Sequence, residues 1–255
     1  MIRIEKKYGN LDVLAMVPET GLESIVYVLE PLKVMPVLEQ FVHAGAAIIS
    51  IFGMDWNRDL TPWPAPAVLK KGGDFEGNAD RFLASLIGTV IPELENTIGI
   101  SAPPATSACG TVSSLTPEST PTPETNPSGT SAKTGSGRVC RYIVGVSLAG
   151  MFAVYSTFHT SLFDGAGSVS GSFWYDGFTD YIKDREPRAG KYYLSIGEKE
   201  KEARNPRLAK SETCTREVET WLAGKGKKTL FELTQGGHFT EGPQRVADAI
   251  RWLIR

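Results

Sequence analysis

A serine between two apolar segments is the strongest candidate for chemistry in this sequence. The apolar run Tyr142–Val144 stops at Gly145, Ser147 follows two residues later, and an apolar stretch of helical length begins after it. This order predicts a strand, a sharp turn and a helix, which strains the serine backbone and holds the hydroxyl beyond the end of the strand. The first N–H groups of the helix then lie beside the hydroxyl without intrahelical partners. Because a glycine–x–serine triplet also occurs by chance, an ordinary strand-to-helix turn is the alternative interpretation.

A serine hydroxyl becomes a good nucleophile only when a base removes its proton. The chain has three histidines, and His238 is the preferred base because it follows the expected strand Lys228–Leu233 and two glycines that permit a sharp turn. His43 and His159 are expected at the C-terminal ends of helices, where the carbonyl groups favour a positive charge. A loop histidine without a chemical role is the alternative for His238.

The carboxylate that would orient His238 is expected after the preceding strand, Tyr192–Ile196. The loop that follows this strand holds three glutamates, of which Glu200 is the first choice and Glu198 the second. A solvated charge is the alternative for any one of the three, and it applies to at least two of them. The resulting order of serine, glutamate and histidine is the one expected of an α/β-hydrolase. All three side chains are predicted to follow strands, which would bring them to one edge of a parallel sheet.

The negatively charged intermediate of acyl transfer needs two backbone N–H donors. The N–H of Leu148, the residue after the serine, is one candidate. The other is Leu32, in the loop after the first buried strand, where Pro31 has no N–H to offer. Residues of two loops are predicted to line the substrate pocket: Trp56, Arg58, Trp63 and Trp174. For the tryptophans, packing in the core is an equal alternative.

Expected strands and helices alternate along the chain. The β-branched runs Ser24–Leu29 and Ala46–Phe52 are typical of buried parallel strands, and Leu11–Val17 is predicted to be an antiparallel edge strand. The alternation predicts one α/β domain over residues 1–255, with a mainly parallel sheet and helices on both faces. Further elements are expected at Pro36–Val42, Asn78–Leu94, Gly165–Val169, Arg207–Leu222 and Gln244–Ile254.

The segment Ser101–Gly137 has a different composition, rich in serine, threonine and proline, with few residues to bury. Such a segment cannot offset its ordering entropy by burial, so we expect a flexible, exposed insertion within the domain. A tolerated surface loop is favoured over a lid, because a lid usually needs an apolar underside.

The remaining composition narrows the class of function. A net charge of −2 provides no basic surface for binding nucleic acid. The sequence contains no run of about eighteen apolar residues, so no membrane span is expected. The charged start of the chain lacks a secretory apolar core, so a cytoplasmic location is expected. Cys109, Cys140 and Cys214 are too few and too scattered for a disulfide framework or a zinc site. No metal or cofactor is expected. A small-molecule ester is the expected partner, and a homo-oligomer is left open.

Four motifs together resemble the esterase D and enterochelin-esterase-like branch of the α/β-hydrolases. They are the serine turn Gly145–Gly150, the stretch Leu162–Trp174 that follows it, the segment Asp55–Pro64, and the turn Gly237–Phe239. The resemblance covers most of the chain outside residues 101–137. It implies an α/β-hydrolase fold, Ser147 as nucleophile, His238 as base, and hydrolysis of carboxylic esters such as siderophore or small acyl esters.

The sequence departs from that family at Glu30-Pro31, where the family has aspartate and glycine, and in the length of the insertion. Our leading hypothesis is a serine esterase that works through an acyl-enzyme. An acyltransferase that uses the same acyl-enzyme, and an inactive binding protein with this fold, are the two alternatives.

Overall fold

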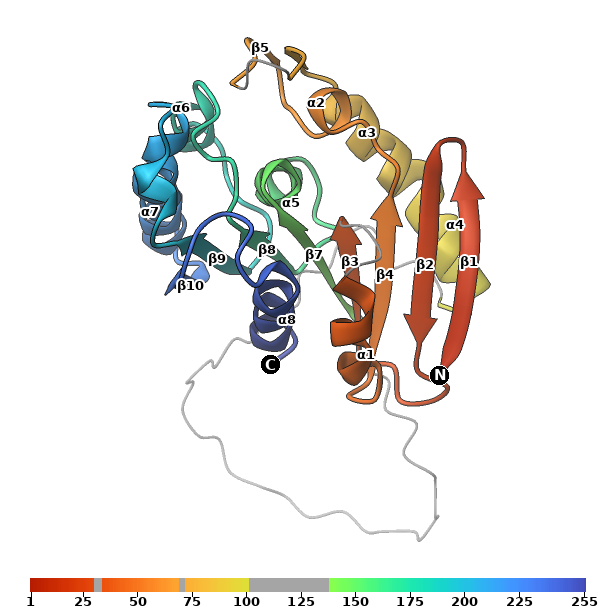
Figure 1. Ribbon diagram of the computed structural model, residues 1–255. Helices are drawn as coiled ribbons and strands as arrows, with labels where there is room; N and C mark the ends of the chain where they lie inside the picture. The colour runs from red at the N-terminus through yellow and green to blue at the C-terminus, as the bar shows by residue number, and fades with distance from the viewer. Residues whose placement is uncertain (30–33, 69–71, 101–137) are drawn as a thin grey trace, which may run out of the picture.

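An eight-stranded sheet forms the centre of the protein, with strand order β1-β2-β4-β3-β7-β8-β9-β10 (Figure 1). The computed structural model describes residues 1–29, 34–68, 72–100 and 138–255. The strands of this sheet are β1 (Ile2–Tyr8), β2 (Leu11–Val17), β3 (Ser24–Leu29), β4 (Ala46–Phe52), β7 (Cys140–Val146), β8 (Gly165–Val169), β9 (Lys191–Gly197) and β10 (Lys228–Thr234). A separate short pair is formed by β5 (Pro64–Ala65) and β6 (Phe75–Glu76).

Six of the eight strands form consecutive parallel pairs. The parallel pairs are β4 with β3, β3 with β7, β7 with β8, β8 with β9, and β9 with β10. Near one margin of this sheet, β2 pairs antiparallel with β1 on one side and with β4 on the other. The carboxyl ends of β7, β9 and β10 therefore lie along one edge of the sheet, and these are the strands that precede the predicted serine, glutamate and histidine.

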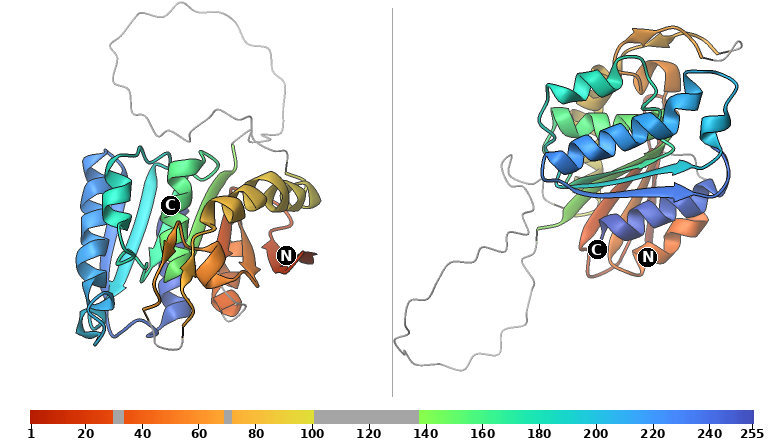
Figure 2. Two further views of the ribbon diagram at one scale, coloured as in Figure 1. Left: turned by 90° about the horizontal axis from the view of Figure 1, so that it is seen from above. Right: turned by 90° about the vertical axis from the view of Figure 1, so that its left-hand side faces the viewer.

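Helices cover both faces of the sheet, as the two views of Figure 2 show. One face carries α1 (Met35–Val42) and α8 (Gly242–Leu253). The other carries α5 (Leu148–His159), α7 (Ser211–Gly224) and the helical run that contains α3 (Ala79–Ser85) and α4 (Ile91–Thr97). Alternate residues of β3 face opposite sides: Val26 and Val28 pack with α1 and α8, whereas Tyr27 packs with the other layer. The predicted mainly parallel sheet with helices on both faces is confirmed.

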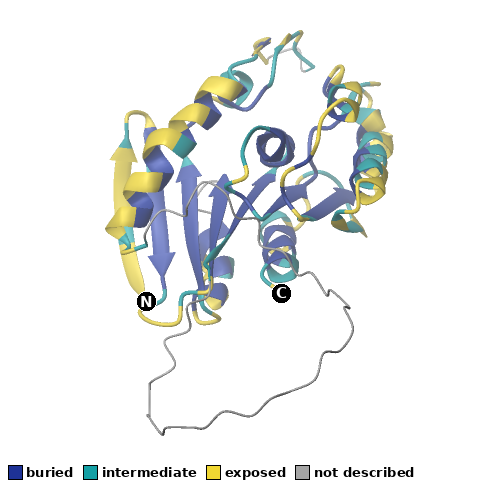
Figure 3. Cartoon of the chain, turned by 180° about the vertical axis from the view of Figure 1, so that it is seen from behind, coloured by how far each residue is buried: buried dark blue, intermediate teal, exposed yellow. Residues whose placement is uncertain are grey.

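The helix after the serine lies in the interior. Every residue of α5 from Leu148 to Phe158 is buried, because the sheet covers one side and neighbouring helices cover the other. The ring of Phe152 packs against that of Phe82 in α3 (Ala79–Ser85), with 5.3 Å between centroids. Figure 3 shows α5 and the inner strands buried, with exposed residues on the outer elements. A helix that is apolar all round is expected at such a position.

Several element predictions needed correction. β2 is not an edge strand, because the charged segment Ile2–Tyr8 pairs outside it as β1. Mostly exposed lysine, arginine and glutamate side chains on β1 discourage further strand pairing at that margin. The helix predicted at 207–222 begins as a 3₁₀ turn, η4 (Leu208–Lys210), and continues as α7.

The remaining differences are small. The helix predicted at 78–94 is a continuous run of α3, a π-helical segment η2 (Leu86–Val90) and α4 (Ile91–Thr97). A short helix, α2 (Trp56–Asp59), replaces part of the expected loop, and α6 (Phe178–Lys183) lies between β8 and β9. The insertion predicted at 101–137 lies outside the described residues. Among the described helices, none combines the length and the apolar composition that a membrane span requires.

Gly145 should not tolerate a side chain. A Cβ atom at this position would lie 2.4 Å from the backbone carbon of Ala149, where β7 and α5 approach most closely. We expect Gly145→Ala to lower the free energy of unfolding by about 2 kcal/mol or more, because neither backbone can move away without unpacking. Chemical denaturation checks this value.

Gly224→Ala is the matched control. Gly224 is exposed near the end of α7, and an added Cβ would have no neighbour within 4 Å. This variant should be neutral or more stable by about 0.5 kcal/mol. Equal stability of the two variants would mean that the close approach at Gly145 is not required.

Candidate active site

The predicted strand, turn and helix around Ser147 are present. Ser147 has φ 57° and ψ −123°, a region that residues other than glycine rarely occupy. Its backbone is held on both sides, since its N–H donates to the Val169 carbonyl at 2.9 Å and its carbonyl accepts from the Met151 N–H at 3.0 Å and the Ser172 N–H at 3.0 Å. The strain at the serine is therefore fixed by β8, by α5 and by the segment after β8.

Of the two predicted oxyanion donors, Leu148 belongs to the described residues. Leu148 is the first residue of α5, and the N–H groups of a first helical turn have no intrahelical partner. The residue lines the same cavity as Ser147. The other predicted donor, Leu32, lies outside the described residues together with Pro31.

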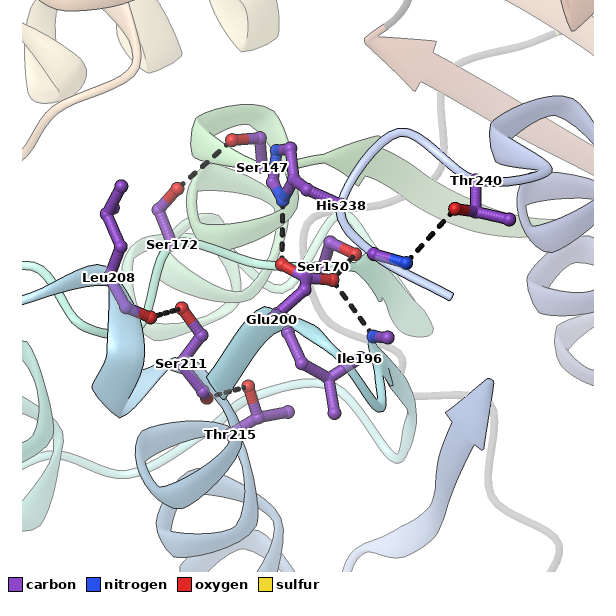
Figure 4. A network of polar contacts seen from close by, with 12 residues as sticks. Ser147, Ser170, Ser172, Ile196, Glu200, Leu208, Ser211, Thr215, His238 and Thr240 are labelled. Atoms are coloured by element: carbon purple, nitrogen blue, oxygen red, sulfur yellow. Dashed lines mark hydrogen bonds and ion pairs between the residues drawn. The ribbon is translucent and has the colours of Figure 1, made fainter. Parts of the chain in front are cut away.

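Glu200 and His238 form a direct hydrogen bond. The Oε2 atom of Glu200 lies 2.8 Å from Nδ1 of His238 (Figure 4). The other oxygen, Oε1, accepts from the Ser170 hydroxyl at 2.5 Å and from the Gly197 N–H at 2.9 Å. Because these two donors occupy Oε1, the carboxylate presents Oε2 to the histidine. Glu200 begins the 3₁₀ helix η3 (Glu200–Glu202) after β9, and the histidine follows the turn after β10.

The carboxyl group of Glu200 is held ionised. Burial by itself raises its pKa, but the hydrogen bonds from His238, Ser170 and Gly197 outweigh burial and bring the pKa below the ordinary value of 4.5. An ionised carboxylate can only accept hydrogen bonds, so Nδ1 of His238 carries the proton in the contact. In the neutral imidazole, Nε2 then has the free lone pair that a base needs.

Ser147 and His238 line one cavity, but no hydrogen bond joins them within the described residues. The Ser147 hydroxyl is instead 3.2 Å from the hydroxyl oxygen of Ser172, a fully buried side chain. Contacts between a nucleophile and its base are often loose before substrate binds. The structure thus brings the serine and the histidine to one site without a closed contact.

The other candidate groups lie elsewhere. Glu198 directs its carboxylate to the Gly236 N–H at 3.5 Å, so Glu200 rather than Glu198 contacts the histidine. His43 follows the end of α1. His159 ends α5, about 16 Å along the helix from its start, and its Nε2 lies 2.7 Å from the Tyr181 hydroxyl.

A cavity of about 910 Å³ opens beside Ser147 and has largely apolar walls. Trp56 and Trp174, two of the predicted pocket residues, line it. Arg58 does not line it, because its guanidinium turns to the Asp59 carboxylate, with contacts of 2.8 and 3.0 Å. Trp63 also lies outside this wall. Its indole N–H donates to the Asp176 carbonyl at 2.9 Å, and its ring packs against Tyr175 and Tyr181.

Three polar residues at the site were not predicted from the sequence. Ser170 and Ser172 belong to the segment after β8 and contact Glu200 and Ser147, respectively. Arg245, in the first turn of α8, lies with its Nη1 4.0 Å from Oε1 of Glu200. The serine run carries no charge and no periodicity. The arginine belongs to an amphipathic helix, and the sequence alone does not show whether its side chain is buried or exposed.

Comparison with known proteins identifies the fold. No protein-family model matches the chain. The uncharacterised protein YbbA of Bacillus subtilis (strain 168) is 22% identical over 203 residues, which cover 76% of this chain and 68% of that protein. Among solved structures, the siderophore hydrolase EstB from Aspergillus nidulans is similar with a TM-score of 0.66 and 14% identity, over 99% of this chain and 93% of that one.

The enterochelin esterase from Shigella flexneri is similar with a TM-score of 0.63 and 16% identity. That likeness covers 100% of this chain and 59% of the esterase, so the chain spans about three fifths of the length of that protein. A ferulic acid esterase gives a TM-score of 0.57 at 12% identity, over 99% and 95% of the two chains. The protein therefore has the same fold as these solved esterases, as the sequence motifs predicted.

Glu200 should make stability depend on pH. Because its pKa is lowered in the folded protein, its contribution is complete above about pH 4.5 and is lost as the pH falls through the lower folded value. We expect Glu200→Gln to cost about 1–2 kcal/mol of unfolding free energy at pH 7, and less as the pH falls towards 3. Urea unfolding at several pH values measures the difference.

Glu198→Gln is the matched control, because the Glu198 side chain is exposed in the same loop. It should change the unfolding free energy by less than about 0.5 kcal/mol at any pH. A cost of Glu200→Gln that stays constant from pH 7 to pH 3 would contradict a carboxylate held ionised by its hydrogen bonds.

Proposed function

We propose that this protein is a serine esterase that cleaves carboxylic esters through an acyl-enzyme. The hydrogen bond between Oε2 of Glu200 and Nδ1 of His238, on the wall of the cavity that also holds Ser147, carries the proposal. It leaves Nε2 of His238 as the basic atom beside a serine in a strained turn. These are the parts that acyl transfer to a hydroxyl nucleophile requires.

The reaction follows from these groups. Nε2 of His238 takes the proton from the Ser147 hydroxyl as Oγ attacks the ester carbonyl carbon, and the carbonyl oxygen becomes an oxyanion. The N–H of Leu148 stabilises that oxyanion, and we propose Leu32 for the second donor. When the intermediate collapses, the imidazolium gives its proton to the departing alcohol, and the acyl group stays on Ser147. Water then repeats both steps and releases the acid.

Glu200 supports the histidine in both steps. Its negative charge stabilises the imidazolium that forms when His238 takes a proton, and its hydrogen bond keeps the ring in one orientation. Ser170 and the Gly197 N–H hold the carboxylate in place. Loss of this support should lower the rate more than the affinity for substrate, because the imidazolium exists mainly in the transition state.

The cavity favours an ester with an apolar portion. Its walls include Trp56, Phe75, Trp174 and Phe239, with the Ser147 hydroxyl among the few polar groups. Sites of this kind bind apolar parts of a ligand through burial and orient them with a small number of polar groups. We propose Trp56 and Trp174 as substrate contacts. The similar solved structures include proteins named as siderophore hydrolase, enterochelin esterase and ferulic acid esterase, which supports ester hydrolysis as the class of reaction.

Replacement of the serine tests the proposal. Purified protein should release p-nitrophenol from p-nitrophenyl esters, and Ser147→Ala should lower kcat by about 10⁴-fold or more, because no other group can form the acyl-enzyme. Ser161→Ala is the matched control, since that serine is exposed beyond the end of α5. Its activity should equal that of the unmodified protein.

Two further measurements separate the alternatives. Labelling by a fluorophosphonate that Ser147→Ala abolishes would distinguish an activated serine from an inactive binding protein. Product analysis with added alcohols would reveal transfer to an acceptor other than water. Absence of both labelling and ester cleavage across a range of acyl lengths would contradict the proposed esterase.

A further inference from the structure

A buried arginine lies beneath the Glu200–His238 pair. The side chain of Arg245 is 3% exposed, and its Nη1 lies 4.0 Å from Oε1 of Glu200, which is itself 6% exposed. Its Nη2 donates a long hydrogen bond of 3.5 Å to the Ser195 hydroxyl in β9. Arg245 does not line the cavity, so the guanidinium faces the acid of the pair from the side away from substrate.

This position is costly for the folded protein. The Nε and Nη1 atoms of Arg245 are buried and have no hydrogen-bond partner among the described residues. Burial also lowers the pKa of the guanidinium, although arginine remains charged in proteins. In addition, Arg245 lies in the first turn of α8, where the helix dipole disfavours a cation. An incompletely paired buried cation is weak evidence for a stabilising role.

We propose that Arg245 is a positioning residue that lowers the proton affinity of His238 by placing a fixed positive charge behind Glu200. The inference rests on the proposed function, in which His238 is the base. Without a counter-charge, a buried carboxylate would favour the imidazolium strongly and hold His238 protonated at higher pH. The guanidinium partly neutralises the negative charge of Glu200. It also repels the imidazolium, because both groups are positively charged. Both effects keep Nε2 free to act as a base.

The other charged groups near the pair are less suited to this role. Lys199 lines the cavity and Glu198 lies in the same loop, but both are exposed, so solvent screens them. Glu232 in β10 and Tyr193 in β9 also favour the charged form of Arg245 and so oppose the lowering of its pKa by burial. Arg245 is the buried cation in contact with the acid.

NMR titration of the histidine rings tests the inference without turnover. The chain has three histidines, so assignment needs only His43→Gln and His159→Gln. Arg245→Met should move the pH midpoint of the His238 ring upward by about one unit, with the other two midpoints unchanged. Arg245→Lys keeps the charge, so its His238 midpoint should lie close to that of the unmodified protein. If the methionine variant does not fold, Arg245→Gln also removes the charge and retains a polar group for Ser195.

Arg251→Met is the matched control on the same helix, because Arg251 is partly exposed and pairs with Asp248. It should leave the His238 midpoint unchanged. In ester hydrolysis, the acid limb of the kcat/KM profile should move to higher pH with Arg245→Met and not with Arg251→Met. A midpoint that does not move, with activity lowered equally at every pH, would assign Arg245 a purely structural role and overturn the inference. A protein without esterase activity would contradict the proposed function, while the ring titration would still decide the role of Arg245.

Discussion

The chain can turn from β7 into α5 at Ser147 only where the two backbones meet without side chains between them. A Cβ on Gly145 would lie 2.4 Å from Ala149, and one on Gly150 would lie 2.8 Å from the Ser168 hydroxyl. The turn also strains the serine backbone, at a cost of about 1–3 kcal/mol. Burial of a single large apolar side chain contributes about 1.5–3 kcal/mol, and α5 is buried from Leu148 to Phe158. The packing of one apolar helix is therefore sufficient to hold the serine in a conformation that it would not adopt alone.

The parallel sheet brings residues that are distant in sequence close together at the site. β7, β8, β9 and β10 are successive neighbours, and the polar groups of the site follow their carboxyl ends. The strand between the serine and glutamate strands is β8, which explains why its following segment supplies Ser170 and Ser172 to both partners. The site is thus a property of the sheet edge as a whole, and α8 adds Arg245 from below it.

The sequence was informative wherever a local constraint determined the structure. The β-branched runs at β3 and β4, the turn at Ser147, and the glycines before His238 have few alternative conformations, so their elements were predicted within a few residues. The order of strands predicted the loop that holds the acid but did not distinguish Glu200 from Glu198, and the structure places Glu200 against the histidine. Predictions that depended on side-chain direction were less successful. Arg58 turns to its neighbour Asp59, and Trp63 turns to Asp176, which is distant in sequence. The spacing of residues along the chain does not predict either hydrogen-bond partner. The pairing of β1 and the burial of Arg245 depend on tertiary contacts and were likewise not predictable from local sequence.

A crystal structure of the protein after reaction with a fluorophosphonate tests the central claim most directly. We predict a phosphorus–oxygen bond to Ser147, with Nε2 of His238 within hydrogen-bond distance of the adduct, Glu200 still bound to Nδ1, and the phosphoryl oxygen at the N–H of Leu148. An adduct on a different residue, or a phosphonylated Ser147 with the His238 ring turned away and beyond reach, would contradict the account.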